Sequence, residues 1–125
     1  FMEHHAELPG SVVYEVADFF SYAPGQGFVF VWDYAVFCAL DPEQRSGWAE
    51  AMGRLVNPNG ILATLIFPYE DPISEREGPP WPINTDLVRS FLAVAFDELE
   101  VSEAERSHPG REGKERLALW RRGGA

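Results

Sequence analysis

The sequence predicts an α/β fold over residues 1–125, which form one domain or part of one. Residues 28–33 and 61–67 are apolar runs rich in β-branched and aromatic side chains, a pattern typical of parallel strands buried on both faces. Each run is followed by a segment in which apolar residues recur with helical spacing. Two further strand patterns end the chain, so we expect a βαβ arrangement closed by an antiparallel pair.

The amino-terminal part of the chain has weaker signals than the rest. Residues 11–16 follow a Pro-Gly turn and alternate between apolar and polar side chains, which predicts a strand. Residues 21–27 contain Pro24 and two glycines, which indicates a loop. The strand over residues 28–33 begins directly after this loop.

A helix is predicted over residues 41–56 because its start carries three matching signals. Asp41 suits the N-cap, Pro42 the first helical position and Gln44 the capping box. A turn at residues 57–60 ends this helix. The side chains expected on its buried face are those of Trp48, Met52, Leu55 and Val56.

The strand over residues 61–67 is followed by a proline-rich loop over residues 68–82 and then by a second helix over residues 85–95. Asn84 or Thr85 caps this helix. Its buried side chains are expected to be Leu87, Val88, Phe91, Leu92 and Ala95.

The last two strands are predicted over residues 97–104 and 115–121. A Ser-His-Pro-Gly turn at residues 107–110 lies between them, which indicates an antiparallel pair.

Composition excludes several classes of function. The formal net charge is −10 and no basic run occurs, so nucleic acid and anionic membranes are not expected as partners. The single cysteine, Cys38, excludes an internal disulfide and every zinc site built from several cysteines, and no metal is predicted. No membrane-spanning run or signal peptide is visible, so a cytoplasmic location is expected.

The carboxyl end of the strand over residues 28–33 is the predicted site. Open α/β sheets bind ligands at this edge, and the strand ends there in Asp33 and Tyr34. A carboxylate at the end of a buried strand either faces a cleft or caps the following loop. Phe37 is expected in the wall of the pocket.

Five motifs, in order along the chain, resemble the thiopurine and thiol methyltransferase family. The chain's ADFF turn, its VWDY strand end with the following FCAL segment, its RLVNPNG turn, its GPPWP loop and its ERLALWR strand each match a family motif. Their positions are residues 17–20, 31–40, 54–60, 78–82 and 115–121. The resemblance implies the Rossmann-like sheet of class I methyltransferases, with the last strand inserted antiparallel between the second and the penultimate strand.

The resemblance also implies a reaction and a cofactor. The reaction is methyl transfer from S-adenosylmethionine to a small thiol, thiopurine or halide acceptor. Asp18 would accept a hydrogen bond from the adenine amino group, with Phe19 on the adenine face; alternatively, Asp18 caps its own turn. Asp33 would lie near the sulfonium, as a catalytic and cofactor-binding residue, and Tyr34 would cover the methyl group.

The acceptor pocket of the family is bordered by the loop that matches residues 78–82. The resemblance therefore assigns Pro79, Pro80 and Trp81, together with Phe37, to the acceptor wall. The alternative is a proline-stiffened crossover loop in which Trp81 fills the edge of the core.

The chain lacks two features with which the family binds S-adenosylmethionine. No glycine-rich turn of the G-x-G-x-x-G kind occurs in it, and the acidic residue at the end of the family's second strand, which holds the ribose, is missing as well. We therefore expect the carboxyl-terminal part of a methyltransferase domain, inactive in isolation and with an open strand edge prone to self-association. The alternative function is a non-catalytic Rossmann-half remnant that acts as an interaction module. A nicotinamide-linked enzyme would also need a glycine-rich turn.

Overall fold

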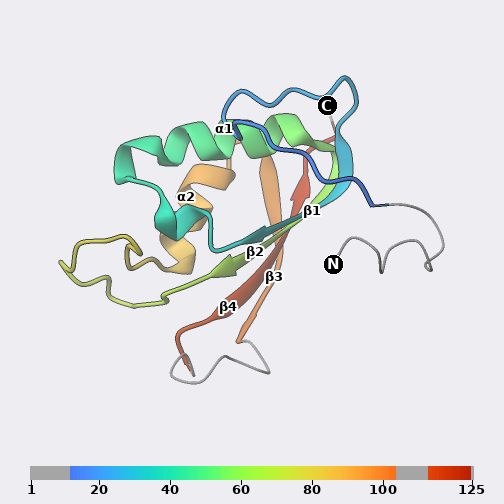
Figure 1. The fold of residues 1–125 in the computed structure, drawn as a ribbon. Helices are drawn as coiled ribbons and strands as arrows, with labels where there is room; N and C mark the ends of the chain where they lie inside the picture. Colours follow the sequence, from blue (N-terminus) through green and yellow to red (C-terminus); the bar gives the residue numbers. More distant parts are fainter. Residues whose placement is uncertain (1–11, 104–112, 125) are drawn as a thin grey trace.

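The structure is a computed structural model that describes residues 12–103 and 113–124. One mixed sheet forms its centre, and two helices pack on it (Figure 1). The elements are the strands β1 (Phe28–Tyr34), β2 (Val56–Ile66), β3 (Phe96–Glu103) and β4 (Arg116–Arg122), the helices α1 (Arg45–Leu55) and α2 (Thr85–Leu92), and the 3₁₀ turns Phe37–Ala39 and Pro42–Gln44.

The strand order is β1-β2-β4-β3, which confirms the predicted topology. β1 and β2 are parallel because α1 connects them, and β4 lies antiparallel between β2 and β3. The predicted antiparallel pair at the end of the chain is thus present. The expected turn between its strands, at residues 107–110, lies outside the described residues.

Both helices cover the same face of the sheet (Figure 1). The α1 segment begins as predicted: the Gln44 side chain accepts a hydrogen bond from the Asp41 N–H at 3.2 Å, and Pro42 opens a 3₁₀ turn that leads into the α-helix. Trp48, Met52 and Leu55 are buried against the sheet, as expected. Trp48 and Met52 join one core cluster with Trp120, whose indole N–H donates to the Thr64 hydroxyl at 3.0 Å.

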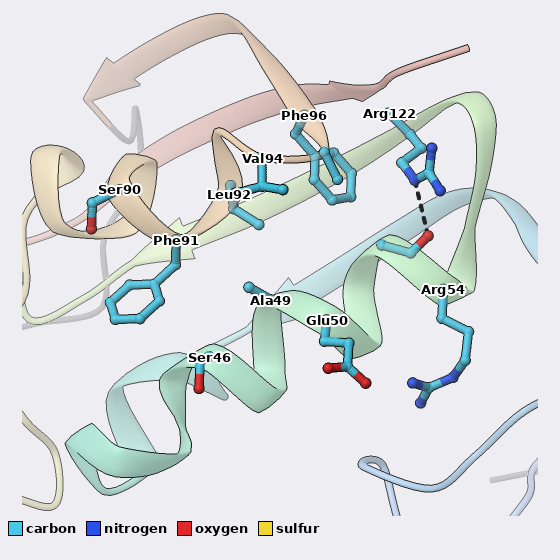
Figure 2. A pocket seen from close by; sticks show the side chains of 12 residues that line it. Ser46, Ala49, Glu50, Arg54, Ser90, Phe91, Leu92, Val94, Phe96 and Arg122 are labelled. Atoms are coloured by element: carbon cyan, nitrogen blue, oxygen red, sulfur yellow. Dashed lines mark hydrogen bonds between the residues drawn. The ribbon is translucent and has the colours of Figure 1, made fainter. Parts of the chain in front are cut away.

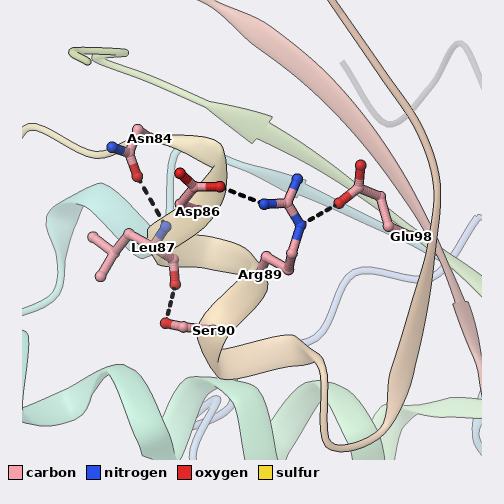
Figure 3. A network of polar contacts seen from close by, with 6 residues as sticks. All are labelled: Asn84, Asp86, Leu87, Arg89, Ser90 and Glu98. Atoms are coloured by element: carbon pink, nitrogen blue, oxygen red, sulfur yellow. Dashed lines mark hydrogen bonds and ion pairs between the residues drawn. The ribbon is translucent and has the colours of Figure 1, made fainter. Parts of the chain in front are cut away.

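α2 is capped by Asn84, whose side chain accepts from the Leu87 N–H at 2.9 Å. Figure 3 shows how Arg89 then ties the helix to the sheet. Its guanidinium contacts Asp86 within the helix and Glu98 on β3, the latter at 2.6 Å. The helix ends at Leu92 rather than at residue 95, and Val88 and Leu92 are its buried residues.

The structure differs from the predictions at residues 12–16 and at residues 57–60. Residues 12–16 form no strand and Val16 is fully exposed, because no neighbouring strand within the described residues pairs with them. β2 begins at Val56 and includes the turn expected at residues 57–60. In the pairing with β1, Phe28 is opposite Val56 but Phe30 is opposite Ile61, so the extra residues form an irregularity inside the strand.

β1 was expected to be buried on both faces, and this is also wrong. Phe30, Trp32 and Tyr34, which alternate onto one side of the strand, are 55%, 47% and 47% exposed. The helices cover only the other face, and β1 pairs only with β2 among the described residues. Within the same residues, no helix is long and apolar enough to cross a membrane.

We expect the open edge and aromatic face of β1 to drive self-association, so that the chain sediments as a dimer or larger species. Phe30→Lys places a charge on this strand and should shift the chain towards monomer. Val94→Lys is the control, because Val94 is 95% exposed but lies outside the sheet. A wild-type chain that sediments as a monodisperse monomer contradicts this expectation.

Candidate active-site edge

Asp33 lies at the carboxyl end of β1 and is 3% exposed. One carboxylate oxygen accepts the Val36 N–H at 3.2 Å, and the other accepts the Trp48 indole N–H at 3.1 Å. The structure thus shows the capping role that was the alternative for Asp33. Its predicted contact with a cofactor stays a prediction.

Burial raises the pKa of Asp33 from 3.8 to about 6, and the hydrogen bonds from Val36 and Trp48 offset only part of this effect. The carboxyl group is therefore half protonated near pH 6. The hydrogen bond from the Trp48 indole to this carboxylate joins the end of β1 to α1, because Trp48 belongs to that helix.

The turn after Asp33 is strained. Ala35 has φ = 61°, a left-handed conformation that costs a residue with a Cβ about 1–2 kcal/mol. The Asp33–Val36 hydrogen bond closes the turn over this residue. Tyr34, which precedes Ala35 and is the last residue of β1, is 47% exposed.

Phe37 is 3% exposed and lies in the core cluster rather than on an open surface. Its ring makes edge contacts with Trp48, at a centroid distance of 4.7 Å, and with Phe91, at 6.0 Å. The guanidinium of Arg45 lies over the ring, 5.3 Å from its centroid. Phe37 therefore anchors its turn against both helices.

The loop of residues 78–82, here called the acceptor loop, is seated on the same turn. The Trp81 backbone N–H donates to the Cys38 carbonyl at 2.8 Å. The acceptor loop is also bound by Arg76, whose guanidinium donates to the Pro80 carbonyl at 3.0 Å. The same guanidinium forms an ion pair with Glu70 at 2.6 Å. The structure thus brings together residues that follow β1 and residues that follow β2.

Asp18 and Phe19 belong to a separate cluster. The Asp18 carboxylate accepts the Phe20 N–H at 3.0 Å, which is the capping alternative. This turn is tied to the far end of α1, where Arg54 donates to the carbonyls of Phe20 and Tyr22. Phe19 lines a hollow of about 580 Å³ beside Phe28, the first residue of β1.

A second hollow, also of about 580 Å³, lies between α1 and the α2–β3 connection (Figure 2). Phe91, Leu92 and Val94 form part of its wall. At one end Arg122 donates to the Gly53 carbonyl at 2.9 Å. None of the predicted site residues lines this hollow. The described residues also contain no cluster of three or more potential metal ligands.

Sequence reasoning missed three polar residues that shape the edge: Trp48, Arg76 and Arg45. The helical spacing of apolar residues predicted that Trp48 lies in the core, but this spacing does not indicate that its indole N–H contacts Asp33. Arg76 lies among four acidic residues, Glu70, Asp71, Glu75 and Glu77, and this arrangement was the available signal for an ion pair.

The sheet order and the helices on its face are those of class I methyltransferases. The N-methyltransferase NodS from Bradyrhizobium japonicum WM9, solved in complex with S-adenosyl-L-homocysteine, has this fold, with a TM-score of 0.61. It is 18% identical, and the match covers 85% of this chain and 52% of NodS.

The family follows from the sequence match. The family model described as Thiopurine S-methyltransferase (TPMT) matches residues 3–122, and the chain belongs to this family. It is 37% identical to thiocyanate methyltransferase 1 of Brassica oleracea over 84% of this chain and 46% of that protein. It is 32% identical to thiopurine S-methyltransferase of Vibrio campbellii over 74% of this chain and 42% of that protein. The chain thus spans about half the length of the curated relatives that it matches.

Proposed function

We propose that the protein transfers the methyl group of S-adenosylmethionine to a small thiol, thiopurine or halide acceptor. Family membership supports the reaction. The position of the acceptor pocket is supported by the 2.8 Å hydrogen bond from the Trp81 backbone N–H to the Cys38 carbonyl. This bond holds the acceptor loop against the turn that follows β1. This is the sheet edge at which α/β proteins bind ligands.

When bound, S-adenosylmethionine supplies a methyl group that its sulfonium already activates. The chain then has to align the acceptor with that methyl group and exclude water. Pro79, Pro80 and Trp81 supply an apolar wall for the acceptor, and Tyr34 extends from the adjoining turn. The buried Asp33 fixes that turn through its bonds to Val36 and Trp48.

Asp18 and Phe19 are proposed to hold the adenine ring. In the full-length protein, Asp18→Ala should weaken S-adenosylhomocysteine binding about 10- to 100-fold, because a hydrogen bond to a charged group is lost. Cys38→Ala is the comparison, since the Cys38 side chain is buried and its thiol contacts the Ala35 carbonyl at 3.4 Å, away from the Asp18 turn. Titration calorimetry measures both, and a larger effect of Cys38→Ala would place the cofactor elsewhere.

A further inference from the structure

The turn of residues 18–22, here called the adenine turn, is fastened to the last turn of α1 by one side chain. The Arg54 guanidinium donates through Nε and Nη2 to the Tyr22 carbonyl, at 3.2 and 3.0 Å. The same Nη2 donates to the Phe20 carbonyl at 3.2 Å. In Figure 2 the Arg54 side chain extends from α1 towards the segment that contains this turn.

A second contact with α1 lies along the same side of the helix. A Cβ on Gly47 would lie 3.3 Å from Cδ1 and from Cε1 of the Phe20 ring, so this ring packs directly on the helix backbone. Gly47 and Arg54 are seven residues apart, which places both on one side of α1. The Phe20 ring in turn makes an edge contact with the Phe19 ring, at a centroid distance of 5.4 Å.

Within the adenine turn, every backbone N–H that is bonded donates to Asp18. The N–H groups of Ser21 and Tyr22 donate to the Asp18 carbonyl at 3.1 and 2.8 Å, and that of Phe20 donates to the carboxylate at 3.0 Å. Asp18, Phe20 and Ser21 are exposed, so water competes for these bonds. Arg54 is therefore the main contact that holds the outer carbonyls of the turn in place.

The residues of the adenine turn fit an adenine ring. One Asp18 carboxylate oxygen accepts from Phe20, and the second accepts no hydrogen bond within the described residues, so it is open to an amino group. Phe19 and Tyr22 line the hollow of about 580 Å³ beside the turn. The positions of the open oxygen and of the Phe19 ring both depend on the conformation of the turn.

We propose that Arg54 is a positioning residue for the cofactor, and that it acts through the adenine turn. The inference rests on the proposed function and adds to it a residue that contacts only the backbone of the turn. A guanidinium suits this role because its planar fork donates to two carbonyls at once and stays charged. Since Trp48 of the same helix binds Asp33, α1 fixes both the adenine turn and the end of β1.

The first test measures amide hydrogen exchange in the ¹⁵N-labelled 125-residue chain by NMR. Arg54→Gln should speed the exchange of the Phe20, Ser21 and Tyr22 amides at least about tenfold, because the turn opens more often. Arg54→Lys keeps the charge but lacks the fork, and should restore part of the protection.

The matched control is Arg122→Gln. Arg122 donates to the Gly53 carbonyl at 2.9 Å, so this variant loses a backbone contact at the same end of α1 without touching the adenine turn. The three turn amides should exchange in it as in the wild type. Unchanged indole N–H signals of Trp48 and Trp120 show that each variant is folded.

The second test measures S-adenosylhomocysteine binding by titration calorimetry, with the protein in a form that binds S-adenosylmethionine. Arg54→Gln should weaken binding at least about tenfold, and Arg122→Gln should leave it unchanged. Because Arg54 acts through the turn, Asp18→Ala combined with Arg54→Gln should bind within about twofold of Asp18→Ala alone. A general loss of stability would instead multiply the two effects.

Three results would overturn the proposal: turn amides that exchange at the wild-type rate in Arg54→Gln, a loosened turn with unchanged S-adenosylhomocysteine binding, or losses that multiply in the double variant. The proposed function can fail separately. A protein that binds the cofactor and depends on Arg54 for this binding, but forms no methylated product, would contradict methyl transfer and leave the role of Arg54 intact.

Discussion

S-Adenosylhomocysteine is expected to bind the 125-residue chain with a dissociation constant of about 1 mM or weaker. These residues hold the turn with Asp18 and Phe19 and the acceptor loop, but they contain no glycine-rich turn for the methionine and ribose groups. Each charged hydrogen bond contributes about 1.5–3 kcal/mol, so two or three missing bonds remove roughly 3–9 kcal/mol. A ligand that a site with all of these contacts binds at micromolar concentration would then bind at millimolar or worse.

Titration calorimetry of the 125-residue chain with S-adenosylhomocysteine measures this dissociation constant. The indole signals of Trp48 and Trp120 serve as the control for folding, because both depend on tertiary hydrogen bonds. Micromolar binding by the 125-residue chain would show that the residues present here suffice for the cofactor.

The stability of the chain should decrease as the pH rises from about 4.5 to 7, because of Asp33. Its pKa is about 6 in the folded state against 3.8 ordinarily, so the folded chain binds more protons than the unfolded chain between these values. The free energy of unfolding therefore falls by about 2 kcal/mol between pH 4.5 and 7, and the loss is nearly complete about one pH unit above the folded pKa.

Urea unfolding at several pH values, with Asp33→Asn as the matched variant, measures this slope. The amide cannot ionise, so the variant should be less stable overall but should lack the decrease. At lower pH Glu70 has the opposite effect on the free energy of unfolding, which it raises as the pH rises. The reason is that the hydrogen bond from Arg76 holds the pKa of Glu70 below the ordinary value of 4.5. Equal slopes for the wild type and the variant between pH 4.5 and 7 would exclude Asp33 as the cause.

The central elements of the fold could be predicted because local signals agree with tertiary packing. The strand that ends at Asp33 and the helix that begins after Asp41 carry apolar patterns and a cap that need no knowledge of neighbours. Asn84 marks the start of α2 for the same reason. The antiparallel insertion of β4 came from the family resemblance, since spacing alone does not order strands in a sheet.

The errors lie where structure depends on a neighbour. Residues 12–16 have strand-like alternation but no adjacent strand among the described residues, so their side chains stay exposed. β1 has the composition of a buried strand, yet burial also requires a layer on its second face. At residues 57–60 the turn was recognised, but its inclusion in β2 depends on pairing with β1.

The sequence predicted where the candidate site lies in the fold, but not which side chains contact one another there. The sequence places Asp33 at a strand end, whereas its partner Trp48 is 15 residues further along and reaches it only through the packing of α1. Trp81 was expected as part of an apolar wall. Its indole N–H is buried and has no hydrogen-bond partner within the described residues, which only a contact-by-contact comparison of donors and acceptors reveals.

Methyl transfer to a small acceptor is tested most directly by product analysis. The protein, in a form that binds S-adenosylmethionine, is incubated with this cofactor and sodium thiocyanate, and methyl thiocyanate and S-adenosylhomocysteine are quantified by chromatography. We predict that both products form in equal amounts and that Trp81→Phe raises the KM for thiocyanate more than it lowers kcat. No methylated product from thiocyanate, iodide, hydrosulfide or a thiopurine, with a folded protein that binds the cofactor, would contradict the account.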